Sequence, residues 1–170
     1  MHVSKLTPVI ISTVFITLIS VFPGLNFLNM ICCAGVMLGS YLGTAYYHKQ
    51  LKNNNELIQF KDGASIGLLS GILSALISMF ILTLMTIAFK QNPVPMLYEM
   101  IDKQGITLPP EAENLLRKIS DEYNKSGFSI TITIVNLIAY LITYPLFGIL
   151  GGILGVALFR KRDLKNITNI

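Results

Sequence analysis

FKDGASIGLLSGILSALIS, residues 60–78, places small side chains at a regular spacing within an apolar run. After Lys61 and Asp62 the stretch contains no charged side chain. The small residues recur at every fourth position, so on a helix they would share one face. They are Gly63, Gly67, Gly71 and Ala75, with Ser70, Ser74 and Ser78 beside them. In lipid, this GxxxG-type pattern lets two helix backbones approach closely. The stretch therefore predicts a membrane helix around which other helices pack.

The composition of the chain is typical of a membrane protein. Of its 170 residues, 52% are hydrophobic and 13% are charged, and the mean hydropathy is +0.62. Soluble domains carry about 25% charged residues. The net charge of +4 arises mostly from basic residues beside apolar runs, which we attribute to orientation in the bilayer. We therefore expect membrane lipid, and no nucleic acid, as a partner.

Four apolar runs predict four transmembrane helices. They lie at about 6–22, 25–47, 64–89 and 128–159. The first run is at the short end of what crosses a bilayer, and the last is longer than one crossing needs. Pro145 predicts a bend in one long final helix, because proline cannot donate a hydrogen bond to the preceding turn. We therefore expect one all-α domain, residues 1–170, built as an integral membrane bundle of four helices.

Glycines at fourfold spacing occur in three of the predicted spans. We interpret them as helix-packing positions, because they expose the backbone for close contact. The second span contributes Gly35, Gly39 and Gly43, the third contributes Gly63, Gly67 and Gly71, and the fourth contributes Gly148 and Gly152. We expect the glycines of the second and third spans to pack against each other.

Between the third and fourth spans, residues 90–127 predict two short amphipathic helices outside the membrane. The first covers 96–104 and ends at Gly105, and the second begins near Pro109 and ends at Gly127. Each predicted helix carries its apolar side chains on one face. We expect these faces to rest on the end of the bundle or on the lipid surface, or to dock a partner protein.

The distribution of basic residues predicts the orientation in the membrane. Four spans place both termini on one side, together with the loop that joins the second and third spans. This side holds every basic residue outside 90–127, and basic residues accumulate on the cytoplasmic side of a membrane. We therefore expect a multi-pass protein of the bacterial cytoplasmic (inner) membrane with both termini in the cytoplasm.

Three short motifs lie along this arrangement of spans. They are Phe60-Lys61-Asp62-Gly63 through Gly67, Lys103-Gln104-Gly105-Ile106-Thr107, and Phe147-Gly148 through Gly155 with Arg160-Lys161. With two spans before the first motif and an amphipathic segment between the others, the chain resembles an uncharacterised bacterial four-span membrane family, domain of unknown function 4199. The resemblance implies a four-span fold. The family carries no known activity or site residues, so the resemblance implies no particular function.

The inner part of every predicted span lacks Asp, Glu, Lys, Arg and His. Proton-coupled transporters and pumps place such a group within the membrane, so its absence disfavours them. A channel lined by backbone carbonyls is weakened but stays open. The polar groups of interest are in the fourth span, where Asn136 favours a hydrogen bond to a neighbouring helix. Asn136, Tyr140 and Tyr144 are also the candidate residues for a cavity in the membrane.

No pattern in the sequence predicts a catalytic or metal site. Cys32 and Cys33 are adjacent, so on a helix they point about 100° apart and cannot share a metal in the usual way. His2 and His48 are at span ends, without an obvious carboxylate or nucleophile nearby in the sequence. We therefore expect no catalytic residue, no metal and no cofactor, and we do not expect an enzyme.

Abundant helix-packing surface and few reactive groups together suggest a non-catalytic role. We expect a small scaffold or accessory subunit that packs in the membrane against a protein partner or against copies of itself. The alternative is a transporter or channel for a neutral or lipid-like solute, with a cavity between the last span and the others.

Overall fold

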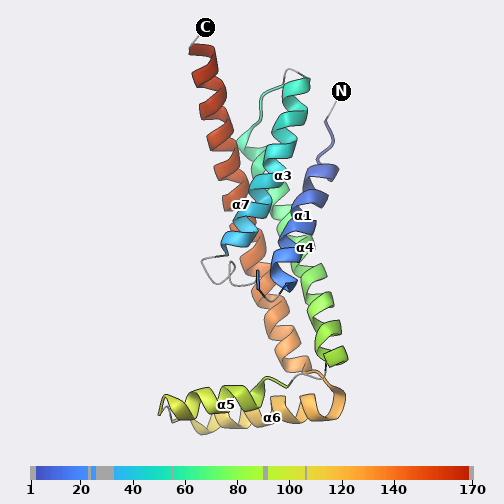
Figure 1. Cartoon of the computed structure of the whole chain (residues 1–170), viewed down its shortest axis with the longest axis vertical. Coiled ribbons are helices and arrows are strands. Elements are labelled where there is room, and N and C mark those ends of the chain that lie inside the picture. Colours follow the sequence, from blue (N-terminus) through green and yellow to red (C-terminus); the bar gives the residue numbers. More distant parts are fainter. Residues whose placement is uncertain are drawn as a thin grey trace. The chain divides into compact units, whose positions relative to one another are not determined.

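The computed structural model describes residues 3–22, 24–25, 33–54, 56–89, 92–105 and 107–168, with only the backbone described for 164–168. These residues form helices and no strands, which confirms the all-α class. The helices are α1 (Leu6–Val21), α3 (Ala34–Asn53), α4 (Phe60–Phe89), α5 (Val94–Lys103), α6 (Pro110–Ser126) and α7 (Ile130–Thr168), as shown in Figure 1.

The chain forms two compact units. Unit 1 comprises Met1–Ser78 and Ala139–Ile170, and unit 2 comprises Met79–Ile138. Unit 1 therefore contains α1, α3, the first part of α4 and most of α7. Unit 2 contains α5 and α6, together with the end of α4 and the start of α7.

The long helices extend beyond the predicted spans. α3 continues to Asn53, and α4 begins at Phe60. α7 is continuous from Ile130 to Thr168 with Pro145 inside it, so the prediction of one long final helix is confirmed. Residues 26–32 of the second predicted span lie outside the described residues.

Two of the described helices are long and apolar enough to cross a bilayer. They are α4 and the segment Ile130–Asp163 of α7, whose most apolar 18-residue stretches have mean hydropathies of 2.4 and 2.0. α1 is also apolar, but it has only 16 residues. The expectation of membrane helices therefore holds for α4 and α7 by length and composition.

Unit 1 exposes large apolar side chains and buries hydroxyl groups. Two outward columns, with side chains 44–66% exposed, are formed by Leu6, Ile10, Val14 and Leu18 on α1 and by Leu146, Leu150, Leu154 and Leu158 on α7. The buried hydroxyls belong to Ser12, Thr13, Thr17, Ser20, Ser40, Thr44, Ser70, Ser74 and Ser78. A water-soluble domain usually has the opposite arrangement, with large apolar residues inside and polar ones outside.

Two small apolar clusters complete the interior of unit 1. The first contains Val9, Tyr47, Leu51, Ile58, Ile66 and Val156, and the second contains Ile16, Val36, Ala75 and Tyr144. Each cluster takes side chains from helices far apart in the sequence, so both clusters depend on the assembled bundle.

In unit 2, α5 and α6 lie side by side and run crosswise to the segments of α4 and α7 that belong to the same unit (Figure 1). Their bounds confirm the two short helices predicted between the third and fourth spans. Gly105 and Gly127 follow the two helices with φ of +64° and +77°, a left-handed conformation that favours glycine. Val94 of α5 and Ile119 of α6 are buried.

Candidate functional site

The glycines of α4 lie against the backbone of α7. A Cβ atom added at Gly63 would meet the carbonyl oxygen of Gly152, and one added at Gly67 would meet the carbonyl oxygen of Gly148. At Gly71 an added Cβ would lie 2.6 Å from Pro145 Cα, where ordinary contacts are 3.4–4 Å. The backbones of α4 and α7 are therefore in direct contact at these three positions, and only glycine on α4 permits so close an approach. We call this contact the α4–α7 seam; it consists of Gly63, Gly67, Gly71, Pro145, Gly148 and Gly152.

The glycines of α3 face α1 rather than α4. A Cβ added at Gly39 would meet the side chain of Ile16, and one added at Gly43 would meet Ser12 Oγ and lie 2.7 Å from the carbonyl oxygen of Pro8. Ser12 Oγ also donates a hydrogen bond to the carbonyl oxygen of Gly39 at 2.6 Å. The predicted pairing of the glycines in the second and third spans is therefore wrong, because each set packs against a different helix.

α7 packs on α3 through a second glycine face. A Cβ added at Gly151 would meet the backbone of Met37, and one added at Gly155 would lie 3.2 Å from Thr44 Cγ2. Gly35, the remaining glycine of the predicted set, is buried on α3. α7 thus contacts α4 through one face and α3 through the next.

Tyr144 connects α7 to α1 inside the core. Its hydroxyl donates a hydrogen bond to Ser20 Oγ at 2.9 Å, and Ser20 Oγ donates to the carbonyl oxygen of Ile16 at 2.8 Å. Tyr144 is 4% exposed, and the ring of Tyr140 stacks on it with centroids 4.9 Å apart. The structure therefore places these two candidate cavity residues in the packed core of unit 1, whereas Asn136 belongs to unit 2.

Some buried hydroxyls of unit 1 have no hydrogen-bond partner among the described residues. They are those of Thr13, Thr17, Ser40 and Ser78. Others donate back to their own helix, as Ser70 does to the carbonyl oxygen of Gly67. A buried polar group without a partner costs about 1–3 kcal/mol. The interior therefore retains hydrogen-bonding capacity that these helices do not use.

Charged side chains pair where α3 ends and α4 begins. Lys5 Nζ lies 2.8 Å from Asp62 Oδ1, and Asp62 Oδ2 accepts a hydrogen bond from the Gln59 N–H at 2.9 Å. Asp62 thus binds Lys5 and stabilises the first turn of α4. His48 Nε2 lies 2.9 Å from Asp163 Oδ2, although no carboxylate was expected near His48. The sequence did not reveal this pair because its members are 115 residues apart.

Unit 2 contains a carboxylate that caps the start of α7. This cap was not predicted from the sequence. One oxygen of Glu122 accepts hydrogen bonds from Ser129 Oγ at 2.5 Å and from the Thr131 N–H at 3.0 Å, and the other accepts from Thr131 Oγ1 at 2.8 Å. These donors belong to the start of α7, where the helix dipole favours negative charge. The hydrogen bond from Ser129, followed by those from Thr131, lowers the pKa of Glu122 from 4.5 to about 2. Ser129, a residue type favoured just before a helix, was the only sequence signal for this cap.

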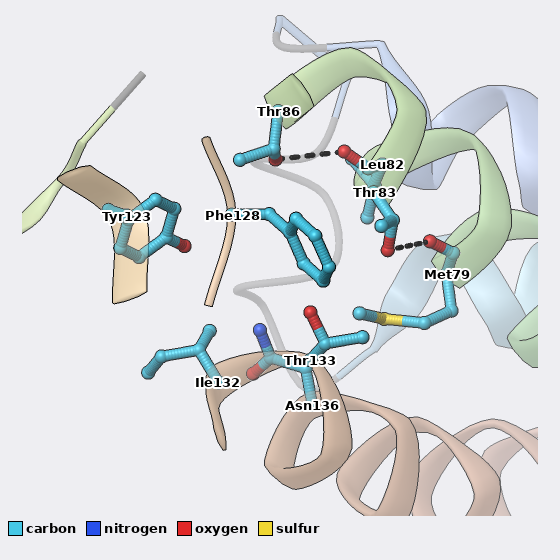
Figure 2. Close-up of a pocket in the computed structure, with 9 residues that line it drawn as sticks. All are labelled: Met79, Leu82, Thr83, Thr86, Tyr123, Phe128, Ile132, Thr133 and Asn136. Carbon is cyan, nitrogen blue, oxygen red and sulfur yellow. Dashed lines mark hydrogen bonds between the residues drawn. The ribbon is translucent and has the colours of Figure 1, made fainter. Parts of the chain in front are cut away.

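Unit 2 also contains a small pocket of about 60 Å³ (Figure 2). The hydroxyl of Thr133 and the amide of Asn136 point toward the ring of Phe128 in Figure 2. The full lining consists of Met79, Leu82, Thr83, Thr86, Tyr123, Phe128, Ile132, Thr133 and Asn136. Asn136, predicted as a candidate cavity residue, therefore lines a pocket.

The polar groups of the pocket carry no charge. Thr83 Oγ1 and Thr86 Oγ1 donate to carbonyl oxygens of their own helix at 2.8 and 2.9 Å, which leaves their lone pairs as acceptors. Burial raises the pKa of the Tyr123 phenol above its ordinary value, so the phenol stays neutral. Asn136 provides both a donor and an acceptor. The lining suits a small neutral molecule, and the volume holds roughly four water molecules.

Among the described residues, no group of three or more His, Cys, Asp and Glu side chains is arranged to hold a metal ion. Cys33 precedes α3 in a left-handed conformation, with φ of 52°, and Cys32 lies outside the described residues. The expectation that these cysteines share no metal stays a prediction.

No family model, curated protein or solved structure matches the chain. The resemblance to domain of unknown function 4199 therefore stays a prediction.

Proposed function

We propose that this protein crosses a bacterial cytoplasmic membrane four times, through α1, α3, α4 and α7, with both termini in the cytoplasm. Within the membrane it acts without catalysis, as a small scaffold or accessory subunit for a protein partner or for further copies of itself.

The distribution of side chains in unit 1 carries this proposal. Large apolar side chains point outward in columns along α1 and α7, whereas hydroxyl groups and glycines lie inside. In water such columns would form an extended apolar surface of the kind that causes aggregation. Lipid tails accommodate them, and close packing of small residues is what holds helices together in lipid.

The lengths of the shorter helices are compatible with four crossings. α1 has 16 residues and α3 has 20. At 1.5 Å per residue α1 is about 24 Å long and the part of α3 that precedes His48 is about 21 Å long, against a hydrocarbon core of about 30 Å. Local thinning of the bilayer accommodates both helices at a modest free-energy cost.

The charged side chains support a role without catalysis, because three of the carboxylates that have partners hold helices in place. Asp62 of α4 binds Lys5, which directly precedes α1. Asp163 joins α7 to α3, and Glu122 caps the start of α7. The glycine faces of α4 and α7 contact other helices of the same chain. A partner must therefore use the outward apolar surface of the bundle rather than the glycines.

Cysteine labelling tests the four crossings. In a variant with Cys32 and Cys33 replaced by serine, single substitutions Lys52→Cys and Glu111→Cys place a thiol in each predicted compartment. A maleimide that cannot cross membranes should label Glu111→Cys in intact cells, and Lys52→Cys only after permeabilisation. Equal labelling of both variants in intact cells would contradict the four-span topology.

Mild detergent extraction from the native cells, followed by native mass determination, tests the scaffold role. A complex of fixed stoichiometry, either with another protein or between copies of this chain, is the expected result. A species containing only one copy with bound lipid would contradict the scaffold role and direct attention to the second candidate function.

The second candidate is transport of a small neutral solute, which the uncharged pocket of unit 2 favours. Water and glycerol flux into vesicles is the measurement, with Asn136→Leu and Thr133→Val as pocket variants. Thr143→Val is the matched control, because Thr143 is a half-buried residue of the same helix that lies outside the pocket lining and whose hydroxyl donates to the carbonyl oxygen of Ala139. Wild-type flux equal to that of empty vesicles would reject this candidate for both solutes.

A further inference from the structure

A groove of about 490 Å³ lies on unit 1 where the loop before α4 meets the end of α7. Its volume is within the range of about 300–1,000 Å³ that is usual for ligand sites. Its lining consists of Leu57, Ile58, Gln59, Phe60, Lys61 and Arg160. Ile58 is 2% exposed and packs in the core, so it anchors one wall of the groove to the bundle.

Two cationic side chains line this groove. The guanidinium carbon of Arg160 lies 5.4 Å from the ring centroid of Phe60, a distance at which a cation is attracted to an aromatic face. Lys61 follows Phe60 on the first turn of α4. Both cationic residues are exposed, so their charges remain accessible to a ligand in the groove.

The nearest carboxylates in the sequence are bound elsewhere. Asp62, next to Lys61, binds Lys5 and the Gln59 N–H. Asp163, three residues after Arg160, is paired with His48. Within the part of the chain that the structure describes, Lys61 and Arg160 form no ion pair. Glu56, which precedes Leu57, is not part of the lining, so the lining itself has two positive charges and favours an anion.

Apolar side chains beside these charges indicate that the anion belongs to an amphiphile. Leu57 is 75% exposed and Phe60 is 45% exposed, which leaves large apolar surfaces next to the cations. On α4, Ala64 and Leu68 follow Phe60 at fourfold spacing, and Leu68 is 40% exposed. A free phosphate ion would make no use of this surface, whereas the acyl chains of a lipid would cover it.

We propose that this groove binds the headgroup of an anionic phospholipid. The phosphate lies between Lys61 and Arg160, and the acyl chains run along the α4 face from Phe60 toward Leu68. The inference rests on the proposed membrane function, in which this end of unit 1 faces the anionic cytoplasmic leaflet. It assigns a role to Lys61 and Arg160, which form no ion pair with the described residues.

The test is a lipid titration of the delipidated protein followed by native mass spectrometry. The probes are phosphatidylglycerol and phosphatidylcholine with identical acyl chains. The wild type should prefer phosphatidylglycerol. Lys61→Gln combined with Arg160→Gln should weaken its binding roughly 30-fold, since each basic residue near an anionic lipid contributes about fivefold. Binding of phosphatidylcholine should not change.

The matched control removes two charges from the end of α3, outside the groove lining, through Lys49→Gln combined with Lys52→Gln. An equal loss of phosphatidylglycerol binding in the control variant would overturn the proposal, because general attraction to positive charge would explain it. Binding of inorganic phosphate as tight as that of phosphatidylglycerol would also overturn it, because the apolar surface would then contribute nothing.

Resistance to alkaline carbonate extraction of cell membranes separates this inference from the proposed function. All variants should remain in the membrane fraction. A protein that resists extraction but shows no preference for phosphatidylglycerol would overturn the lipid site alone. A wild-type protein released by carbonate would instead overturn the integral membrane assignment on which the inference rests.

Discussion

Gly71→Ala adds a methyl group to the α4–α7 seam at a point where no side chain can move aside. The added Cβ would lie 2.6 Å from Pro145 Cα, 2.7 Å from Pro145 N and 2.7 Å from the carbonyl oxygen of Tyr144. All three neighbours are backbone atoms, so the helices must separate until the 2.6 Å contact reaches the ordinary 3.4 Å. Overpacking costs about 1–3 kcal/mol, and the upper end applies here because no rotamer change relieves it. Alanine recovers about 1 kcal/mol through helix propensity, which leaves a net loss of roughly 2 kcal/mol.

Reversible unfolding in mixed micelles, driven by sodium dodecyl sulfate and followed by far-UV circular dichroism, measures this loss. A destabilisation of about 2 kcal/mol corresponds to a roughly 30-fold increase in the unfolding equilibrium constant. Gly24→Ala is the matched control, because an added Cβ there would meet no described atom within 4 Å. If Gly71→Ala is as stable as the wild type or as Gly24→Ala, the two backbones do not touch at this seam and the packing argument is refuted.

Three further predictions concern single polar contacts. The pKa of Glu122 is lowered to about 2, so its stabilising contribution is complete above about pH 4.5 and is lost as the pH falls toward 2. Acid titration of helical content should show this loss in the wild type and not in Glu122→Gln; identical acid profiles would contradict the cap. Tyr144→Phe removes the hydrogen bond to Ser20 and should lower the free energy of unfolding by about 0.6–1.7 kcal/mol in the micelle assay. An unchanged midpoint would show that this contact adds no stability. Asp62→Ala should destabilise the protein by more than the coupling energy between Lys5 and Asp62, because it also removes a helix-capping hydrogen bond worth about 0.5–2 kcal/mol. A double-mutant cycle with Lys5→Ala measures that coupling energy, and an effect of Asp62→Ala no larger than the coupling energy would contradict the capping role.

The elements of the fold could be predicted because their signals are local. Gly105 and Gly127 adopt the left-handed conformation after α5 and α6 that glycine at a helix end suggests. The final apolar run forms one helix through Pro145, because the backbone of a single helix satisfies its own hydrogen bonds on both sides of the proline. Each of these features depends on a few neighbouring residues, which a sequence displays directly.

The candidate site could be predicted only in part. Asn136 was identified because a polar amide in an apolar run is conspicuous, and it lines the pocket of unit 2. The pairing of His48 with Asp163 and the cap that Glu122 provides for α7 were missed. Both join residues of different helices, and the residue types involved are common at helix ends for other reasons.

Residue spacing alone specifies that α3, α4 and α7 each have a glycine face, because the helical repeat sets which residues share a side. It does not specify the partner of each face. The structure pairs Gly67 with Gly148, whereas Gly39 packs on Ile16. Close approach is a property of two backbones together, and many pairs of smooth faces satisfy the same local pattern. The rotation and position of every other helix in unit 1 select among those pairs, so the contacts of the bundle emerge only when all the helices are packed.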